Sequence, residues 1–189
     1  LAVIKPHSEC LYLIGGQSEA GVLASVYLYD PAADSWRPVA ELPGPRAEAA
    51  GGALTGQLYV VGGSDGAAGQ PSCFSYDPPR DTWSDCPDML LPRVDAGATV
   101  LLNKLYVIGG TAADEAAYGE VYDPNTRAWT VLNAPPDMFD WRAPGVTHVE
   151  TRIYAVGGRR GELLSDATLV YSPLTYQTYI PAAPSDREE

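Results

Sequence analysis

The sequence predicts an all-β protein built from four repeated units, each folded as a four-stranded antiparallel sheet. Three observations support this fold class. Gly-Gly pairs recur at nearly constant intervals, at 15–16, 62–63, 109–110 and 157–158. Each pair closes a short apolar run with tyrosine at its second position, a composition typical of strands. No longer window has the period of about 3.6 residues that marks an amphipathic helix.

The strands of one unit are clearest in the second repeat. We expect strands there near 47–54, 57–61, 72–76 and 82–85. The 57–61 segment is continuously apolar, which is typical of a strand buried on both faces. The corresponding apolar runs of the other units are 11–14, 105–108 and 153–156.

Two aromatic markers follow each Gly-Gly pair. A Tyr-Asp-Pro turn begins at Tyr29, Tyr76 and Tyr122, and the fourth unit has Tyr171-Ser172-Pro173 instead. A tryptophan lies seven residues past each of the first three tyrosines, at Trp36, Trp83 and Trp129. The fourth unit has Thr178 at that position, with Tyr179 beside it.

Each marker has a physical reason. Glycine allows backbone angles and close approaches that a Cβ forbids, so a pair at a strand end suits sheets that converge near an axis. Asp and Pro are the residues that form tight turns, and the large aromatic rings can fill the wedge between adjacent sheets. One such unit cannot cover both of its faces, whereas radial stacking covers them.

The repeats therefore predict a β-propeller. We expect one propeller domain over residues 1–189, with blades at approximately 1–43, 44–90, 91–138 and 139–183. Residues 1–4 are expected to be part of a first strand, and residues 184–189 to be a tail or the start of a further repeat.

These residues resemble the kelch repeat, whose pattern is an arginine, an apolar strand, a Gly-Gly pair, a tyrosine and a tryptophan. The "YDP…W" spacing is most similar to the kelch domains of kelch-like (BTB–BACK–kelch) proteins. That family usually has six blades, so the resemblance implies an incomplete six-bladed propeller with four blades present. The alternative is a four-bladed ring, or an open array closed by another copy.

The resemblance also implies a function. Kelch-like propellers capture a peptide or protein for a cullin-type ubiquitin ligase, so we expect a substrate-recognition module for such a ligase. The BTB and BACK segments and the cullin are implied by the resemblance only. The alternative is a cytoskeletal, actin-associated binding module.

The composition of the chain limits the classes of partner that we expect. The formal net charge of −12 disfavours nucleic acid and anionic membrane surfaces as partners. Cys10, Cys73 and Cys86 are odd in number and have no CxxC spacing, so we expect neither a disulfide framework nor a zinc site. This favours a reducing compartment, the cytoplasm, with the nucleus as a second possibility.

Enzymatic function is not expected. Some kelch-fold proteins are enzymes, including copper-radical oxidases, but a copper site needs clustered imidazole and phenolate ligands. The chain has two histidines, His7 and His148, far apart in sequence. It has no P-loop and no GxGxxG motif, so we predict no cofactor, no metal and no catalytic residue.

The resemblance places the ligand face on the loops after each Gly-Gly pair and on the loops that pass through the repeat arginine. The expected partner-binding residues in the first set of loops are Gln17, Ser18, Ser64, Asp65, Thr111, Arg159 and Arg160. Two adjacent guanidinium groups could clamp a carboxylate, and some kelch-like receptors use an arginine at the Arg159 position against acidic peptides. The alternative is that both arginines are solvated at a turn.

Trp141 and Arg142 are further candidates, because they lie in a loop three residues longer than its counterparts and both residue types are common in binding hot spots. Phe139 and Trp141 could instead pack under their own loop. Arg142 is interpreted as the counterpart of Arg46 and Arg93, which belong to the repeat pattern itself. On that alignment the next positions are Ala47, Val94 and Ala143, where the family often has polar ligand contacts. Acidic residues in the other loops, namely Glu19, Asp114 and Glu115, favour a partner of mixed charge.

Overall fold

Twenty β-strands account for the regular secondary structure of the described residues. The computed structural model describes residues 2–4, 10–111, 117–133 and 141–173, and no helix occurs in these ranges. The predictions for His7, Asp114, Glu115, Phe139, Thr178, Tyr179 and residues 184–189 therefore concern residues outside these ranges. Within those ranges no segment forms a helix long and apolar enough to cross a bilayer.

Four antiparallel sheets follow one another along the chain, and we call them blades 1 to 4. Blade 1 contains β1 (Ala2–Ile4), β2 (Leu11–Ile14), β5 (Val26–Asp30) and β6 (Ser35–Val39). Blade 2 contains β7 (Ala50–Leu54), β8 (Gln57–Val61), β9 (Cys73–Asp77) and β10 (Thr82–Cys86). Blade 3 contains β11 (Val94–Leu101), β12 (Lys104–Thr111), β13 (Ala117–Asp123) and β14 (Ala128–Asn133). The described strands of blade 4 are β16 (Gly145–Val149), β17 (Arg152–Val156) and β20 (Thr168–Tyr171).

Two small sheets extend from the blades. The hairpin of β3 (Gln17–Ser18) and β4 (Gly21–Val22) follows the first Gly-Gly pair. A three-stranded sheet contains β15 (Trp141–Arg142), β18 (Arg159–Arg160) and β19 (Leu163–Leu164).

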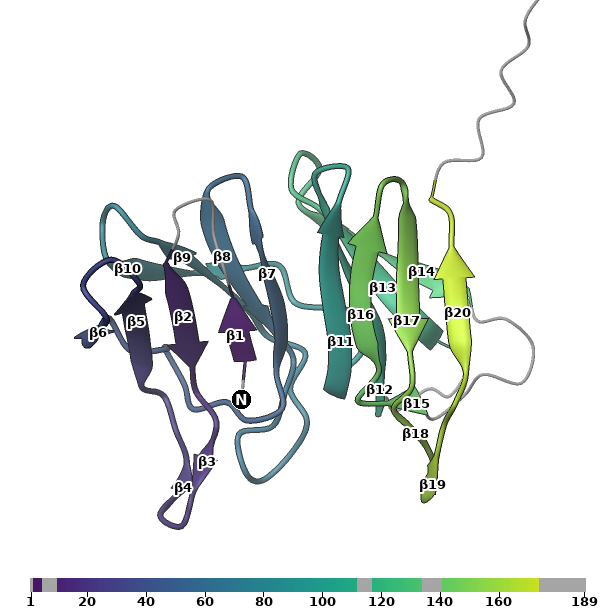
Figure 1. The fold of residues 1–189 in the computed structure, drawn as a ribbon, viewed down its shortest axis with the longest axis horizontal. Helices are drawn as coiled ribbons and strands as arrows, with labels where there is room; N and C mark the ends of the chain where they lie inside the picture. Colours follow the sequence, from purple (N-terminus) through teal and green to yellow (C-terminus); the bar gives the residue numbers. More distant parts are fainter. Residues whose placement is uncertain (1, 5–9, 112–116, 134–140, 174–189) are drawn as a thin grey trace, which may run out of the picture.

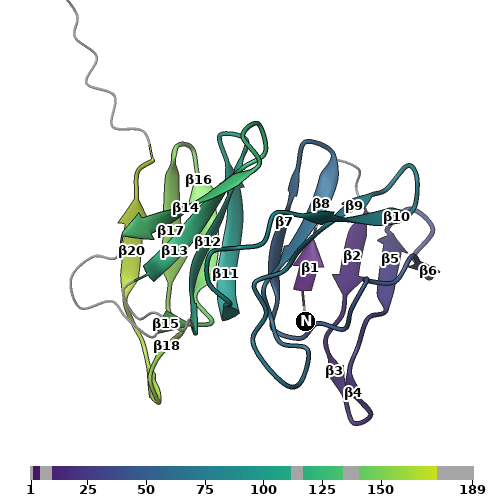
Figure 2. The ribbon, with the colours of Figure 1, turned by 180° about the vertical axis from the view of Figure 1, so that it is seen from behind.

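The blades stack side by side around their first strands (Figures 1 and 2). The inner strands contact one another in the order β1, β7, β11 and β16, and no comparable contact joins β16 back to β1 in the described part of the chain. The hydrophobic cores lie between blades: Tyr12 and Ile14 share one cluster with Leu58 and Tyr76. Two further clusters join blade 2 to blade 3 and blade 3 to blade 4. The all-β fold of stacked antiparallel blades is confirmed.

The Gly-Gly pairs mark the points where one blade's backbone meets the next. An added Cβ would lie 2.2 Å from the Arg46 carbonyl oxygen at Gly15 and 2.5 Å from that of Arg93 at Gly62. The second glycine of the pair donates its N–H across the same junction, from Gly63 to the Arg93 oxygen at 2.7 Å. Gly15 and Gly62, the first glycines of their pairs, also have positive φ. Both the backbone conformation and the close approach therefore require glycine at these positions.

The aromatic markers fill the wedge between blades, as expected. The rings of Tyr76 and Trp83 lie 4.9 Å apart, and those of Tyr122 and Trp129 lie 5.1 Å apart. The Trp83 indole N–H donates to the Ala40 carbonyl oxygen of blade 1 at 2.8 Å, and Trp129 makes the equivalent bond to Pro87 of blade 2 at 2.7 Å. In blades 2 and 3 the tryptophan therefore ties the blade to the one before it.

The prediction that the cysteines form no disulfide framework is wrong for two of the three. Cys73 and Cys86 form a disulfide, with their Cα atoms 5.1 Å apart, while Cys10 is free. Spacing rules miss this pair because the two cysteines lie directly opposite each other on β9 and β10, a relation set by strand register. The predicted cytoplasmic or nuclear location loses the support that unpaired cysteines gave it, and stays a prediction.

Candidate functional site

The loops after the Gly-Gly pairs and the segments around the repeat arginines are joined by backbone pairing. Ala47 bridges to Ser64, Val94 pairs with Thr111, and Arg142 pairs with Arg159. The hairpins β3–β4 and β18–β19 extend from the lower edge of the molecule in Figure 1. We call this the loop edge, defined by residues 17–22, 64–70, 141–142 and 159–164.

The pairing corrects the alignment of the fourth unit. A Cβ added to Gly109 would lie 2.4 Å from the Trp141 carbonyl oxygen, just as a Cβ added to Gly62 would lie close to the Arg93 carbonyl oxygen. Trp141 therefore occupies the position of the repeat arginine, and the interpretation of Arg142 as its counterpart is wrong. The error arose from counting past a longer loop. Arg142 instead corresponds to Ala47 and Val94, the residues directly after the repeat arginines. In the fourth unit this position therefore does carry a charge.

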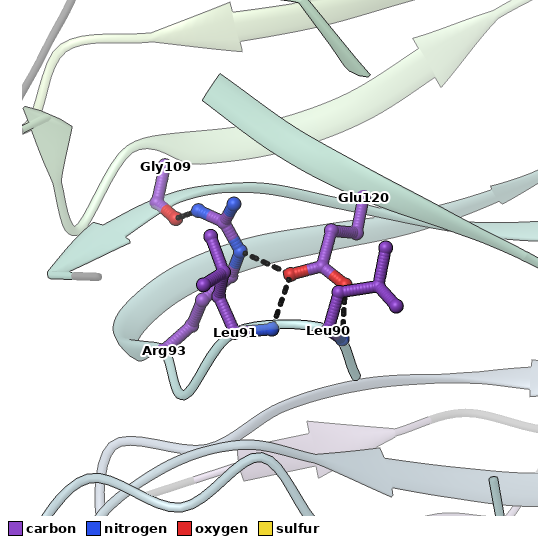
Figure 3. A network of polar contacts seen from close by, with 5 residues as sticks. All are labelled: Leu90, Leu91, Arg93, Gly109 and Glu120. Carbon is purple, nitrogen blue, oxygen red and sulfur yellow. Dashed lines mark hydrogen bonds and ion pairs between the residues drawn. The ribbon is translucent and has the colours of Figure 1, made fainter. Parts of the chain in front are cut away.

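Arg93 is a structural residue of blade 3 (Figure 3). Its side chain is 1% exposed, and its Nε donates to the Glu120 carboxylate at 3.1 Å while a terminal nitrogen donates to the Gly109 carbonyl oxygen at 2.7 Å. The same carboxylate, which is 0% exposed, accepts the backbone N–H groups of Leu90 and Leu91 at 2.7 and 3.2 Å. Burial lowers the pKa of Arg93, and Glu120 opposes that shift.

Arg46 is buried in blade 2 in a different way. Its guanidinium lies 5.2 Å from the centre of the Phe74 ring and donates to the Ser72 hydroxyl at 2.5 Å. Its Nε has no hydrogen-bond partner, and burial lowers its pKa. Phe74 stands where blade 3 has Glu120, two residues before the marker tyrosine. A cation over an aromatic face replaces the ion pair here.

In the fourth unit, the indole of Trp141 takes the place of the repeat arginine's guanidinium. Its N–H donates to the Gly157 carbonyl oxygen at 2.5 Å, which is the bond that Arg93 makes to Gly109. Its ring stacks on Tyr118 with 6.1 Å between centroids, and the side chain is 1% exposed. Trp141 therefore packs inside the junction of blades 3 and 4, where a partner has no access to its side chain.

Arginines gather on the small sheet of β15, β18 and β19. Arg142 lies directly opposite Arg159, and Arg159 lies opposite Leu164. Like charges placed opposite each other repel. Arg159 and Arg160 are both exposed. Within a chain of net charge −12, this sheet is a local cationic surface.

Two leucines that the sequence reasoning missed lie on the same sheet. Leu163 is 76% exposed and Leu164 is 82% exposed, the highest values among the large hydrophobic residues described. An open hollow of about 450 Å³ lies beside them, lined by residues 160–161 and 163–167. The available signal was an apolar pair within a polar turn, Gly161-Glu162-Leu163-Leu164-Ser165.

Of the remaining predicted residues, Ser18, Ser64 and Asp65 lie on the loop edge and stabilise their own loops. The Asp65 carboxylate accepts the N–H groups of Ala67 and Ala68 at 2.8 and 2.9 Å, and the bond from Ala68 is the largest cause that lowers its pKa. The Ser64 hydroxyl accepts the Gly66 N–H at 3.1 Å. Ser18 is exposed and its hydroxyl accepts the Ala20 N–H at 3.2 Å. Gln17 is exposed beside it, and Thr111 ends β12.

The two histidines of the chain, His7 and His148, are the natural candidates for catalysis or metal binding. His148 lies on β16, where its Nδ1 is 3.0 Å from the Thr99 hydroxyl. In the ranges that the structure describes, no group of three or more His, Cys, Asp or Glu residues is placed to hold a metal ion. The loop edge thus offers contacts for binding, through arginines and exposed leucines.

Comparison with known proteins agrees with the blade architecture. The family model of the KLHDC2/KLHL20/DRC7 kelch-repeats domain matches residues 3–179. Among solved structures, that of YjhT is similar, with a TM-score of 0.73 and 20% sequence identity over 90% of this chain. The chain spans 62% of the YjhT chain. At that identity the likeness shows a shared fold and nothing about activity.

Proposed function

This chain belongs to the kelch-repeat family, and on that premise we propose that its loop edge binds an acidic segment of a partner protein. Kelch repeats indicate a protein-interaction propeller. The observation that carries the finer proposal is the pair of opposed arginines, Arg142 and Arg159, with Arg160 next in the chain. A carboxylate placed there could bind the exposed Arg159 guanidinium through two bonds.

The leucines give the proposed partner a second feature. Leu163 and Leu164 lie opposite Arg160 and Arg159 across β18 and β19. Exposed apolar residues beside charged ones are typical of interaction sites. The proposed ligand is therefore an acidic peptide that also carries an apolar side chain.

The direct test is a peptide titration. A fluorescent peptide alternating Glu with Leu is titrated with the wild-type chain and with the double variant Arg159→Ala plus Arg160→Ala, and anisotropy is recorded. We expect the double variant to weaken binding about tenfold or more, because charged hot-spot residues contribute at least about 1.4 kcal/mol. A peptide with Gln in place of Glu reports how much binding requires the carboxylates.

The matched control removes the same charge elsewhere. Arg127→Ala plus Arg152→Ala changes two exposed arginines away from the loop edge, one in the β13–β14 turn of blade 3 and one at the start of β17 in blade 4. It should leave peptide affinity unchanged, whereas an equal loss in both double variants would show a general charge effect and contradict a site at the loop edge. Circular dichroism verifies that both variants keep the wild-type fold.

We further propose that the whole protein is a substrate-recognition subunit of a cullin-type ubiquitin ligase, acting in the cytoplasm or nucleus. The support is the likeness of the repeats to those of kelch-like proteins. The test is co-precipitation of a cullin with the full-length protein from cells, alongside its localisation by fluorescence. Absence of any cullin, together with co-sedimentation with filamentous actin, would contradict the ligase role and favour the cytoskeletal alternative.

A further inference from the structure

The disulfide of blade 2 lies where the chain leaves this blade for blade 3. Cys86 is the last residue of β10, and residues 87–92, which we call the connector, follow it and lead to Arg93. Cys73 is the first residue of β9 and comes directly after the loop that ends in Pro71 and Ser72. One covalent bond therefore joins the start of the connector to the end of that loop.

Hydrogen bonds hold the connector from both sides. On the side of blade 3, the Glu120 carboxylate accepts two of its N–H groups (Figure 3), and the Trp129 indole N–H donates to its first carbonyl oxygen at 2.7 Å. On the side of blade 2, the Met89 N–H donates to the Pro71 carbonyl oxygen at 2.9 Å. The Met89 side chain is 4% exposed and belongs to the same hydrophobic cluster as Cys73. The connector is thus a central part of the junction between blades 2 and 3.

Blade 1 makes the equivalent connection to blade 2 without a disulfide. Val26 and Val39 take the positions of the two cysteines and lie directly opposite each other on β5 and β6. The Leu42 N–H donates to the Ala24 carbonyl oxygen at 2.9 Å, which is the same bond between connector and loop end. Because a free cysteine packs as a small hydrophobic residue, two thiols could fill these positions as the valines do. The oxidised and reduced chains can therefore both be folded, which a switch between two states requires.

The two cysteines differ in access. Cys73 is 1% exposed, whereas Cys86 is partly exposed, so a small thiol such as glutathione approaches the bond from the side of Cys86. Its thiolate attacks the Cys86 sulfur, the disulfide breaks, and the Cys73 sulfur leaves with the electron pair and takes up a proton. A second glutathione thiolate attacks the mixed disulfide, which releases Cys86 and glutathione disulfide. Two electrons pass to the protein, and the reverse sequence closes the bond again.

We propose that the Cys73–Cys86 bond is a redox switch that controls local opening of the connector and of the adjacent end of β10. Three of the five residues of β10 are exposed, and segments with few buried contacts open locally at low cost. The other end of this strand is held by Trp83, whose indole N–H donates to Ala40 of blade 1. Opening in the reduced chain therefore starts at the Cys86 end and loosens the junction between blades 2 and 3. This inference does not depend on the proposed ligand of the loop edge.

Hydrogen exchange measured by mass spectrometry tests the proposal. The wild-type chain is equilibrated in glutathione buffers poised like the endoplasmic reticulum and like the cytosol, and alkylation of free thiols reports the state of the bond. We expect a disulfide in the first buffer and two thiols in the second. In the reduced chain the N–H groups of Met89, Leu90 and Leu91 should exchange about tenfold faster or more at short times, because the cross-link no longer limits local opening.

Two controls separate local opening from a general loss of stability. The Leu42 N–H, in the corresponding connector of blade 1, should keep its exchange rate in both buffers. The double variant Cys73→Ala plus Cys86→Ala should exchange at the rate of the reduced wild-type chain in both buffers. If this variant does not fold, the comparison of the two wild-type states still decides the question.

Several results would overturn the switch. A bond that stays closed at the cytosolic poise would be structural, and thiols that stay free in both buffers would mean that no switch exists. Verified reduction without faster exchange at Met89 would show that the connector does not depend on the bond. Equal acceleration at Leu42, or a circular dichroism spectrum that loses its strand signal on reduction, would show general unfolding instead of local opening.

Discussion

The repeat-arginine position is filled by arginine twice and by tryptophan once, and the residue packed beside it differs each time. Arg46 lies over Phe74, Arg93 pairs with Glu120, and Trp141 shares a hydrophobic cluster with Leu169. Phe74, Glu120 and Leu169 occupy one equivalent position, two residues before the marker tyrosine. The repeats thus keep one location filled by a large side chain that donates a hydrogen bond, and change the chemistry that supports it.

The ion pair in blade 3 gives a prediction at the scale of one residue. Glu120→Leu would remove the carboxylate that pairs with the buried Arg93 guanidinium and would leave two backbone N–H groups without their acceptor. Removing one partner of a buried pair costs about 3–5 kcal/mol, so we expect a loss of that size in the free energy of unfolding measured with urea. The double variant Arg93→Met plus Glu120→Leu should lose less. If Glu120→Leu alone were at least as stable as the double variant, the unpaired charge would not be the cause of the loss in unfolding free energy.

Residue identities in this position could be predicted from the sequence only in part. The spacing located Arg46 and Arg93 correctly, because those loops have equal lengths. It misplaced the fourth copy, since the longer loop allows Trp141 or Arg142 to take the position, and only backbone contacts distinguish them. For the same reason the sequence could not show that Trp141 is buried while Leu163 and Leu164 are exposed.

At the scale of elements, the strands of the second unit agree closely with the sequence prediction. The second unit was expected near 47–54, 57–61, 72–76 and 82–85, and its strands are Ala50–Leu54, Gln57–Val61, Cys73–Asp77 and Thr82–Cys86. Alternation and turn residues determine such boundaries well. The pairing of Cys73 with Cys86 needed the register of two strands, which depends on the hairpin between them and is not visible in cysteine spacing.

The disulfide between β9 and β10 gives a prediction for that element. The two cysteines are separated by 13 residues, and closing a loop of that size stabilises a protein by about 3 kcal/mol through the unfolded state. Adding dithiothreitol should therefore lower the melting temperature of the wild-type chain. The variant Cys73→Ala plus Cys86→Ala should melt at the lower temperature with or without reductant. If dithiothreitol left the melting temperature of the wild-type chain unchanged, the disulfide would not form in solution.

At the scale of the whole molecule, stability depends on the junctions between blades more than on any single blade. The described cores lie between neighbouring blades, and a sheet of this size cannot bury both of its faces alone. Proteins built from stacked repeats owe their stability to repeat units plus nearest-neighbour contacts. A change confined to one junction should therefore uncouple the blades on its two sides.

Gly62 provides that test, and Gly56 provides its control. Both have positive φ, +66° and +80°, so alanine at either position carries the same left-handed backbone strain, about 1–2 kcal/mol. They differ in surroundings: a Cβ on Gly62 would lie 2.5 Å from the Arg93 carbonyl oxygen of the next blade, whereas a Cβ on Gly56 would meet nothing within 4 Å. We expect Gly56→Ala to lose only the strain energy and to unfold in a single urea transition. Gly62→Ala should lose clearly more and should broaden or split the transition, as blades 1 and 2 separate from blades 3 and 4 before either pair unfolds. Equal losses in the two variants, both with one sharp transition, would mean that the blade 2–3 junction can move apart without uncoupling its neighbours.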